Sequence, residues 1–114
     1  MAKYVYIASR VSGDVERNLA LARGYCLYAL SQNVIPVVPH LMLDGVLDDN
    51  EPDEREIGIE VGKHLLTKCD EVWTFLDNRG LSSGMKGEVN LALELGIPVI
   101  PVYWEQILRD IQED

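Results

Sequence analysis

Short apolar runs alternate with longer segments of helical periodicity along the whole chain. Aliphatic, β-branched and aromatic residues dominate the apolar runs, which cover residues 3–8, 34–38, 70–76 and 97–103. Apolar residues recur at helical spacing in the segments that follow them, 14–31, 53–68, 84–95 and 104–111. Strands that alternate with helices in this way predict an α/β fold built on a parallel sheet.

Right-handed crossovers place the helices of such a fold on both faces of the sheet. We expect a single domain over residues 1–114, with a doubly wound, Rossmann- or flavodoxin-like sheet of four to five strands in the order 2-1-3-4. Pro36 argues for an edge position of the second strand, because proline cannot donate to a ladder. Ligands bind beyond the carboxyl ends of such strands at the topological switch, where connectivity brings together the polar turns 9–13 and 77–88.

The segment boundaries carry recognisable signals. We predict an N-cap at Asp14, a helix stop at Gly96, and a capping box formed by Asp53 and Glu56 with Pro52 just outside it. The stretch 39–52 is predicted to be irregular, and its acidic residues lack the offsets of a calcium loop. It is either a solvated surface loop or a lid over a ligand site.

Composition is that of a soluble globular domain, with 47% hydrophobic and 25% charged residues. No apolar run approaches the roughly 18 residues that cross a bilayer, and the first ten residues lack the features of a signal peptide. Cys26 and Cys69 form no CxxC motif and are interpreted as small buried thiols, with a redox pair as the alternative. These features predict a cytoplasmic protein.

The charge balance excludes classes of partner. Ten basic residues face nineteen acidic ones, which gives a formal charge of -9, and the basic residues form no run. Binding to nucleic acid or to an anionic membrane surface is therefore not expected. A small anionic ligand remains open, because backbone donors act locally. His40 and His64 have no partner at ligand spacing, so no metal site is expected.

The two turns at the switch supply the candidate binding residues. Ser82 to Glu88 (SSGMKGE) combines hydroxyls and glycines at a predicted helix start, which is either an anion cradle or an N-cap with flexible glycines. The first turn offers groups for a phosphate, or is simply a solvated turn. The substrate-binding candidates are Ser9, Arg10, Ser12, Asp77, Ser82, Ser83, Gly84 and Met85.

Glu88 and Tyr6 are the candidate catalytic residues. A carboxylate one turn into a helix at the switch point can attack an anomeric carbon, although acidic residues are also favoured near helix N-termini for their charge alone. A phenol near the carboxyl end of the first strand can hydrogen-bond that carboxylate and tune it. The alternative for Tyr6 is a core tyrosine with a satisfied hydroxyl.

Four segments in order resemble the nucleoside 2-deoxyribosyltransferase-like superfamily, in particular its small members from bacteria and phages. They are YIASRVSGDVERNLALARGYC, IPVVPHLMLD, LLTKCDEVWTF and SSGMKGEVNLALELGIPV, and the resemblance spans Tyr4 to Val102. It implies cleavage or exchange of the N-glycosidic bond of a nucleoside or nucleoside 5′-monophosphate, without a cofactor. It also implies a homo-oligomer, since such enzymes often complete the site with a neighbouring subunit.

The resemblance assigns roles residue by residue. Glu88 matches the family's nucleophile and Tyr6 its first-strand tyrosine. Ser82 matches a serine that binds phosphate in the monophosphate N-glycosidase branch, whereas Ser9, Arg10 and Ser12 match that branch's first turn only loosely. The family's aspartate near the end of the second helix falls near Gly62, which has no side chain. This departure keeps open a non-catalytic module that binds a nucleotide, and more remotely a purely structural protein.

Overall fold

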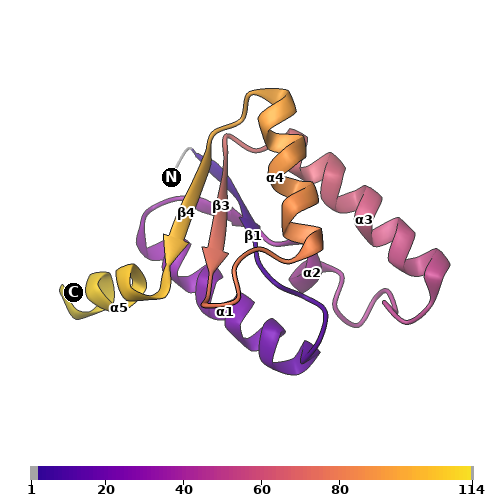
Figure 1. Cartoon of the computed structure of the whole chain (residues 1–114), viewed down its shortest axis with the longest axis horizontal. Coiled ribbons are helices and arrows are strands. Elements are labelled where there is room, and N and C mark those ends of the chain that lie inside the picture. The colour runs from indigo at the N-terminus through magenta and orange to yellow at the C-terminus, as the bar shows by residue number, and fades with distance from the viewer. Residues whose placement is uncertain (1–2, 114) are drawn as a thin grey trace.

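The computed structural model describes residues 3–113, so positions 1, 2 and 114 of the predicted domain lie outside the described residues. Figure 1 shows a sheet flanked by helices. In chain order the elements are β1 (Tyr4–Ala8), α1 (Val15–Ser31), β2 (Ile35–Val37), α2 (Pro39–Met42), α3 (Pro52–Thr67), β3 (Glu71–Leu76), α4 (Ser83–Leu95), β4 (Val99–Tyr103) and α5 (Trp104–Glu113). Over residues 3–113, no helix has the length and apolar character that crossing a bilayer requires.

The sheet is parallel and its strand order is β2-β1-β3-β4, as predicted. The predicted strands are longer than the observed ones by one or two residues at their ends. Pro36 lies in the edge strand β2, and Pro101 lies in the opposite edge strand β4. The second strand is added on one side of β1 and the third on the other, so the topological switch lies between β1 and β3. The carboxyl ends of these two strands lie side by side.

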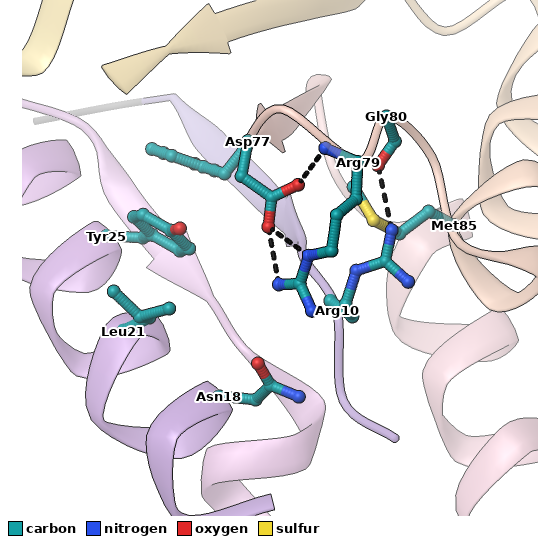
Figure 2. Close-up of a pocket in the computed structure, with 9 residues that line it drawn as sticks. Arg10, Asn18, Leu21, Tyr25, Asp77, Arg79, Gly80 and Met85 are labelled. Atoms are coloured by element: carbon teal, nitrogen blue, oxygen red, sulfur yellow. Dashed lines mark hydrogen bonds and ion pairs between the residues drawn. The ribbon is translucent and has the colours of Figure 1, made fainter. Parts of the chain in front are cut away.

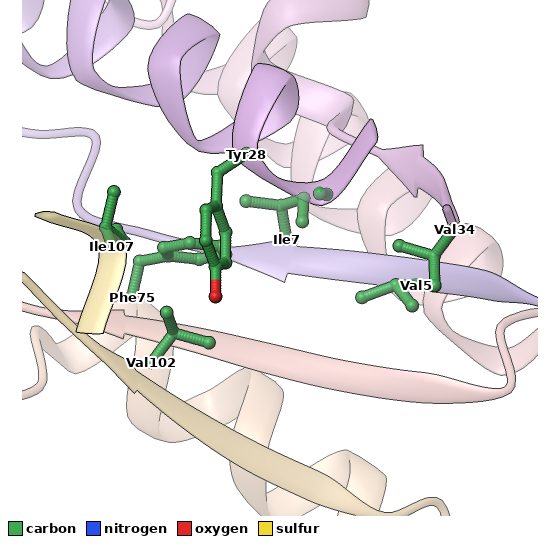
Figure 3. Packing of buried hydrophobic residues seen from close by; sticks show 8 residues of the cluster. Val5, Ile7, Tyr28, Val34, Phe75, Val102 and Ile107 are labelled. Carbon is green, nitrogen blue, oxygen red and sulfur yellow. The ribbon is translucent and has the colours of Figure 1, made fainter. Parts of the chain in front are cut away.

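Each face of the sheet has its own apolar cluster, because successive strand residues point to opposite sides. Val5 and Ile7 point toward α1 and α5, and Tyr6 and Ala8 point toward α3 and α4. Figure 3 shows the first cluster, which comprises Val5, Ile7, Tyr28, Ala29, Val34, Phe75, Val102 and Ile107. The second comprises Tyr6, Ala8, Leu66, Cys69, Val72 and Ala92. The alternation in β1 thus turns Tyr6 toward the helices α3 and α4.

Two predicted helix boundaries are confirmed. The Asp14 side chain accepts a hydrogen bond from the Arg17 amide at 3.2 Å, as an N-cap does. Gly96 ends α4 with φ 72°, the left-handed conformation that glycine adopts without strain. Cys26 and Cys69 are free thiols, and Cys69 is the buried one, whereas Cys26 is only half-buried.

Two predictions around the third helix are wrong. The capping box does not form, because α3 already begins at Pro52 and the N-cap residue is Glu51. No side chain makes a capping hydrogen bond at this helix start. Proline lacks an N–H and has a fixed φ, so it fits the first helical position rather than a place before the helix. The stretch 39–52 is not wholly irregular, since Pro39–Met42 forms α2. A single helical turn is too short to show a periodicity.

Candidate functional site

Glu88 lies on the face of α4 that is turned toward the sheet. It is flanked along that face by Met85 and Ala92, which are 1% and 0% exposed. The spacing of three and four residues keeps these side chains on one side of the helix. Glu88 is half-buried as a result. The carboxyl group is therefore carried inward by the same periodicity that buries its apolar neighbours.

The Tyr6 hydroxyl lies close enough to the Glu88 carboxyl for each group to affect the pKa of the other. Burial removes water from the carboxylate and raises the pKa of Glu88 to about 7, while the hydrogen bond with Tyr6 opposes this rise. Tyr6 is 3% exposed, and burial together with the neighbouring Glu88 raises the pKa of its phenol far above the usual range. Tyr6 thus stays protonated beside a carboxyl that exchanges its proton near neutral pH.

The start of α4 is open to solvent. The Ser82 hydroxyl caps the helix by accepting from the Met85 amide at 3.2 Å, so the Met85 amide is not free for a ligand. The amides of Ser83 and Gly84 have no acceptor within the helix. A Cβ built on Gly84 or on Gly87 would meet nothing within 4 Å. Packing does not require either glycine, and both leave the backbone accessible.

Arg10 and Asp77 lie on the other side of the β1 and β3 ends, in a small cavity beside α1. Figure 2 shows Arg10 donating to the Gly80 carbonyl at 3.1 Å, while Asp77 pairs with Arg79. This pairing holds the pKa of Asp77 below its usual range. Met85 lines the same cavity, whose accessible volume of about 10 Å³ accommodates roughly one water molecule. Arg10, Asp77 and Met85 thus line one cavity, and neither Tyr6 nor Glu88 is among the residues that line it.

The first turn is held by a residue that the sequence analysis did not select. Asn18 is 3% exposed, and its side-chain amide donates to the carbonyls of Val11 and Ser12 at 3.1 and 3.0 Å. Ser12 itself is exposed. A buried amide bonded to two loop carbonyls fixes the path of a turn. Asn18 occupies a helical position near the N-cap Asp14, and its spacing alone gives no signal of this role.

His40 was also missed as a site residue. Its Nε2 lies 3.2 Å from the Ser9 hydroxyl, although 31 positions separate the two in the chain. From the sequence, His40 was considered only as a metal ligand, so this hydrogen bond was not predicted. In the part of the chain that the structure describes, no group of three His, Cys, Asp or Glu side chains is placed to hold a metal ion.

Gly62 lies at the same site. A Cβ on Gly62 would be 3.3 Å from the Tyr6 hydroxyl and 3.9 Å from the ring of Pro39. The buried Gly62 therefore marks the point where α3 approaches β1 and α2. The helix supplies no functional group at this point.

Comparison with solved structures identifies the fold. The chain is similar to the 2-deoxyribosyltransferase of the psychrotolerant bacterium Bacillus psychrosaccharolyticus, with 15% identity and a TM-score of 0.71 over 88% of this chain and 72% of that one. It is similar to a deoxyribosyltransferase from Leishmania mexicana, with 17% identity and a TM-score of 0.58 over 89% of this chain and 64% of that one. A conserved protein from Enterococcus faecalis V583 gives 16% identity and a TM-score of 0.59 over 90% of this chain and 64% of that one.

These similarities establish that the chain has the deoxyribosyltransferase fold. The strand order 2-1-3-4 agrees with that fold. The chain spans less than two thirds of the length of the Leishmania and Enterococcus proteins. No curated protein matches the chain at the level of sequence. A family model described as "Domain of unknown function (DUF7768)" matches residues 3–102, and the chain belongs to that family.

Proposed function

We propose that this protein cleaves or exchanges the N-glycosidic bond of a nucleoside or nucleoside 5′-monophosphate, with Glu88 as the nucleophile. The observation that carries the proposal is the pair formed by the half-buried Glu88 carboxyl and the Tyr6 hydroxyl. Tyr6 belongs to β1 and Glu88 to the helix that follows β3. The carboxyl ends of these two neighbouring strands form the switch where doubly wound folds bind their ligands. The deoxyribosyltransferase fold of the chain supports the same chemistry.

The proposed reaction is a retaining double displacement. The Glu88 carboxylate attacks C1′ of the sugar, the bond between C1′ and the base nitrogen breaks, and the base leaves with the electron pair and takes up a proton. Water or a second base then attacks C1′, and the carboxylate departs. Tyr6 orients Glu88 by donating a hydrogen bond to one of its oxygens. The chemistry as proposed uses the residues of the chain and no cofactor.

The start of α4 favours a phosphorylated ligand. We propose that the open amides of Ser83 and Gly84 and the positive end of the helix dipole hold a 5′-phosphate, with Ser82 shaping the turn. A ligand with this group would agree with the resemblance of Ser82 to the phosphate-binding serine of the monophosphate N-glycosidases. We propose that the whole chain acts as one domain. The cytoplasmic location and the homo-oligomer remain predictions from the sequence.

The test is release of free base. Wild-type protein is incubated with each common deoxynucleoside, ribonucleoside and 5′-monophosphate, and the free base is separated and quantified. The Glu88→Gln variant keeps the shape of the side chain but removes the nucleophile. Glu94→Gln is the matched control, because Glu94 lies on the same helix and is exposed.

The expected result is release of base by the wild type and by Glu94→Gln, with a loss of at least about 10³-fold in Glu88→Gln, comparable to removal of a covalent nucleophile. Equal release by the wild type and Glu88→Gln would contradict the mechanism. A covalent sugar adduct on Glu88, trapped by acid quenching and located by mass spectrometry, would identify the attacking atom directly.

Gly62 favours a second candidate function. The helix α3 has a glycine, and therefore no acidic side chain, at the position next to Tyr6. A Cβ at position 62 would already be 3.3 Å from the phenol oxygen, which leaves little room for a larger side chain. A protein with the pocket but without help for the leaving base would bind a nucleotide without cleaving it. Recovery of an intact ligand that raises the melting temperature, with no base released after long incubation, would support this binding function over the enzyme.

A further inference from the structure

A hydrogen bond between Ser9 and His40 joins the carboxyl ends of β1 and β2. Ser9 is the first residue after β1, and His40 is the second residue of α2. Ser9 is 5% exposed, and its hydroxyl lies 3.2 Å from His40 Nε2. The serine hydroxyl and the imidazole ring thus form one fixed polar group at the carboxyl ends of the strands, where ligands bind in this fold.

The helix α2, which carries His40, borders the Tyr6 and Glu88 site. The ring of Pro39, the residue before His40, lies 3.9 Å from the position of a Cβ on Gly62, and the Tyr6 hydroxyl lies 3.3 Å from the same position. The helix α3 presents only backbone here. His40 follows Pro39 in α2 and Ser9 follows β1, so these are the polar residues that the chain carries next to this side of the site.

His40 has a second nitrogen available for hydrogen bonding. Among residues 3–113, no group forms a hydrogen bond with its Nδ1, and His40 as a residue is partly rather than fully buried. Burial lowers the pKa of His40, although the carboxylate of Asp49 acts in the opposite direction, so the ring is neutral at neutral pH. A neutral imidazole carries one N–H donor and one acceptor nitrogen.

The pair always offers one donor and one acceptor. If the Ser9 hydroxyl donates to Nε2, then Nδ1 carries the free N–H and the serine oxygen accepts. If Nε2 donates to the serine oxygen, then Nδ1 accepts and the serine O–H is the free donor. An ionised phosphate or carboxylate can only accept hydrogen bonds. It therefore cannot donate to the acceptor atom that the Ser9 and His40 pair always presents. An alcohol both donates and accepts, and matches the pair in either tautomer.

We propose that Ser9 and His40 together bind a hydroxyl group of the sugar of the ligand and thereby determine which sugars the site accepts. This inference rests on the proposed function, because it assumes a nucleoside or nucleotide in the site. It adds a specificity element that is separate from the nucleophile Glu88 and from the phosphate site at the start of α4.

The test measures binding without turnover. Dissociation constants are measured by calorimetry with the Glu88→Gln protein. The ligands are three nucleoside 5′-monophosphates that share the base selected by the release assay and differ in the sugar, which is ribose, 2′-deoxyribose or 2′,3′-dideoxyribose. The second substitutions are His40→Gln and Ser9→Ala. Glutamine at position 40 places its amide near the original Nε2, which preserves the bond with Ser9 while removing Nδ1. His64→Gln on the exposed side of α3 is the control.

Removal of the bound hydroxyl from the sugar is expected to weaken binding at least tenfold in the Glu88→Gln and Glu88→Gln/His64→Gln proteins. The same removal is expected to change binding less than twofold once His40→Gln or Ser9→Ala is added, because the partner is already lost. Comparison of the three sugars shows whether the hydroxyl is the 2′ or the 3′ group.

Two results would overturn the inference, and they are distinguishable. If nucleotides bind but the double variants remain as sensitive to each hydroxyl as the Glu88→Gln protein, only the sugar contact is wrong. If no nucleoside or nucleotide binds, the proposed function fails and the sugar contact fails with it. A ligand-dependent change in the nitrogen chemical shift of His40 Nδ1 is the direct signature, and an unchanged shift at saturation counts against the contact.

Discussion

The hydroxyl of Tyr6 lies where a side chain at position 62 would begin. A Cβ on Gly62 would be 3.3 Å from the Tyr6 oxygen, which is closer than an ordinary van der Waals contact. The backbone of α3 thus closes one side of the tyrosine, and Glu88 from α4 lies on another. Two successive helices, α3 and α4, thus flank one phenol oxygen of the strand β1.

Gly62→Ala tests this contact directly. Alanine is a better helix former than glycine by about 1 kcal/mol, so the change alone favours the folded state. At position 62 the new methyl group presses on Tyr6, and overpacking of this kind costs about 1–3 kcal/mol. We expect Gly62→Ala to be at least about 1 kcal/mol less stable than Gly24→Ala in urea denaturation.

Gly24→Ala is the matched control because Gly24 also lies inside a helix, α1, and a Cβ there meets nothing within 4 Å. It is expected to gain about 0.4–1 kcal/mol. Equal gains in the two variants would show that Tyr6 moves freely away from position 62.

Glu88 is expected to destabilise the fold at neutral and alkaline pH. Its pKa is about 7 in the folded protein against the ordinary 4.5, so the folded state binds more protons between these values and stability falls as pH rises through the window. The full effect above pH 7 is about 3–4 kcal/mol, at about 1.4 kcal/mol for each pH unit between the two pKa values. Glu88→Gln is therefore expected to be more stable than the wild type at pH 8.

At pH 4 the difference between the Glu88→Gln protein and the wild type is expected to vanish, because Glu88 is then protonated in both the folded and the unfolded state. Chemical denaturation at a series of pH values measures it. A constant difference from pH 4 to pH 8 would mean that the carboxyl keeps an ordinary pKa and is well hydrated.

Tyr6→Phe should move the pH profile of base release. The nucleophile has to be ionised, so the rate is expected to rise about tenfold per pH unit below pH 7 and to level off above it. The hydrogen bond from Tyr6 lowers the pKa of Glu88, and its loss removes about 1.5 kcal/mol of stabilisation of the carboxylate. The midpoint is expected to rise by about one pH unit.

Tyr4→Phe serves as the control for the pH profile, since Tyr4 is on the same strand but 48% exposed. Its midpoint should match that of the wild type. A Tyr6→Phe protein that loses activity equally at every pH would indicate a purely geometric role for the phenol.

The glycines at the start of α4 should show opposite effects on stability and on binding. Gly84→Ala and Gly87→Ala add a methyl group that meets no atom within 4 Å, so each is expected to stabilise the protein by about 0.4–1 kcal/mol. If the helix start receives a phosphate, the same methyl groups obstruct the ligand, and nucleotide binding should weaken several-fold. A gain in stability with unchanged binding would place the phosphate elsewhere.

The fold could be predicted from the sequence because its signals are local. The apolar runs around Val5, Val72 and Val102 are short and separated by helical periods, which is enough to indicate a parallel sheet, and Pro36 marks an edge strand. The stop at Gly96 follows from one residue type in one conformation. The start at Pro52 was missed because Asp53 and Glu56 also satisfy a capping pattern, and only the path of the backbone decides between them.

The site could be predicted only in part. Glu88 and Tyr6 are brought together as expected, because a strand end and a helix start at the switch point converge by topology. The bond between Ser9 and His40 depends on a single turn, α2, that periodicity does not show. The contact of Arg10 with Gly80 joins two loops 70 positions apart, and turn composition carries no information about such a pairing.

Pro36 and Pro101 have a consequence beyond the topology that they mark. Each lies in one of the two outer strands, so each border of the sheet contains a residue without an amide hydrogen. Neighbouring molecules are hindered from adding strands at either border, which protects a concentrated sample from fibrillar growth. Any association between copies of the chain is accordingly expected to use helix surfaces rather than a continuous intermolecular sheet.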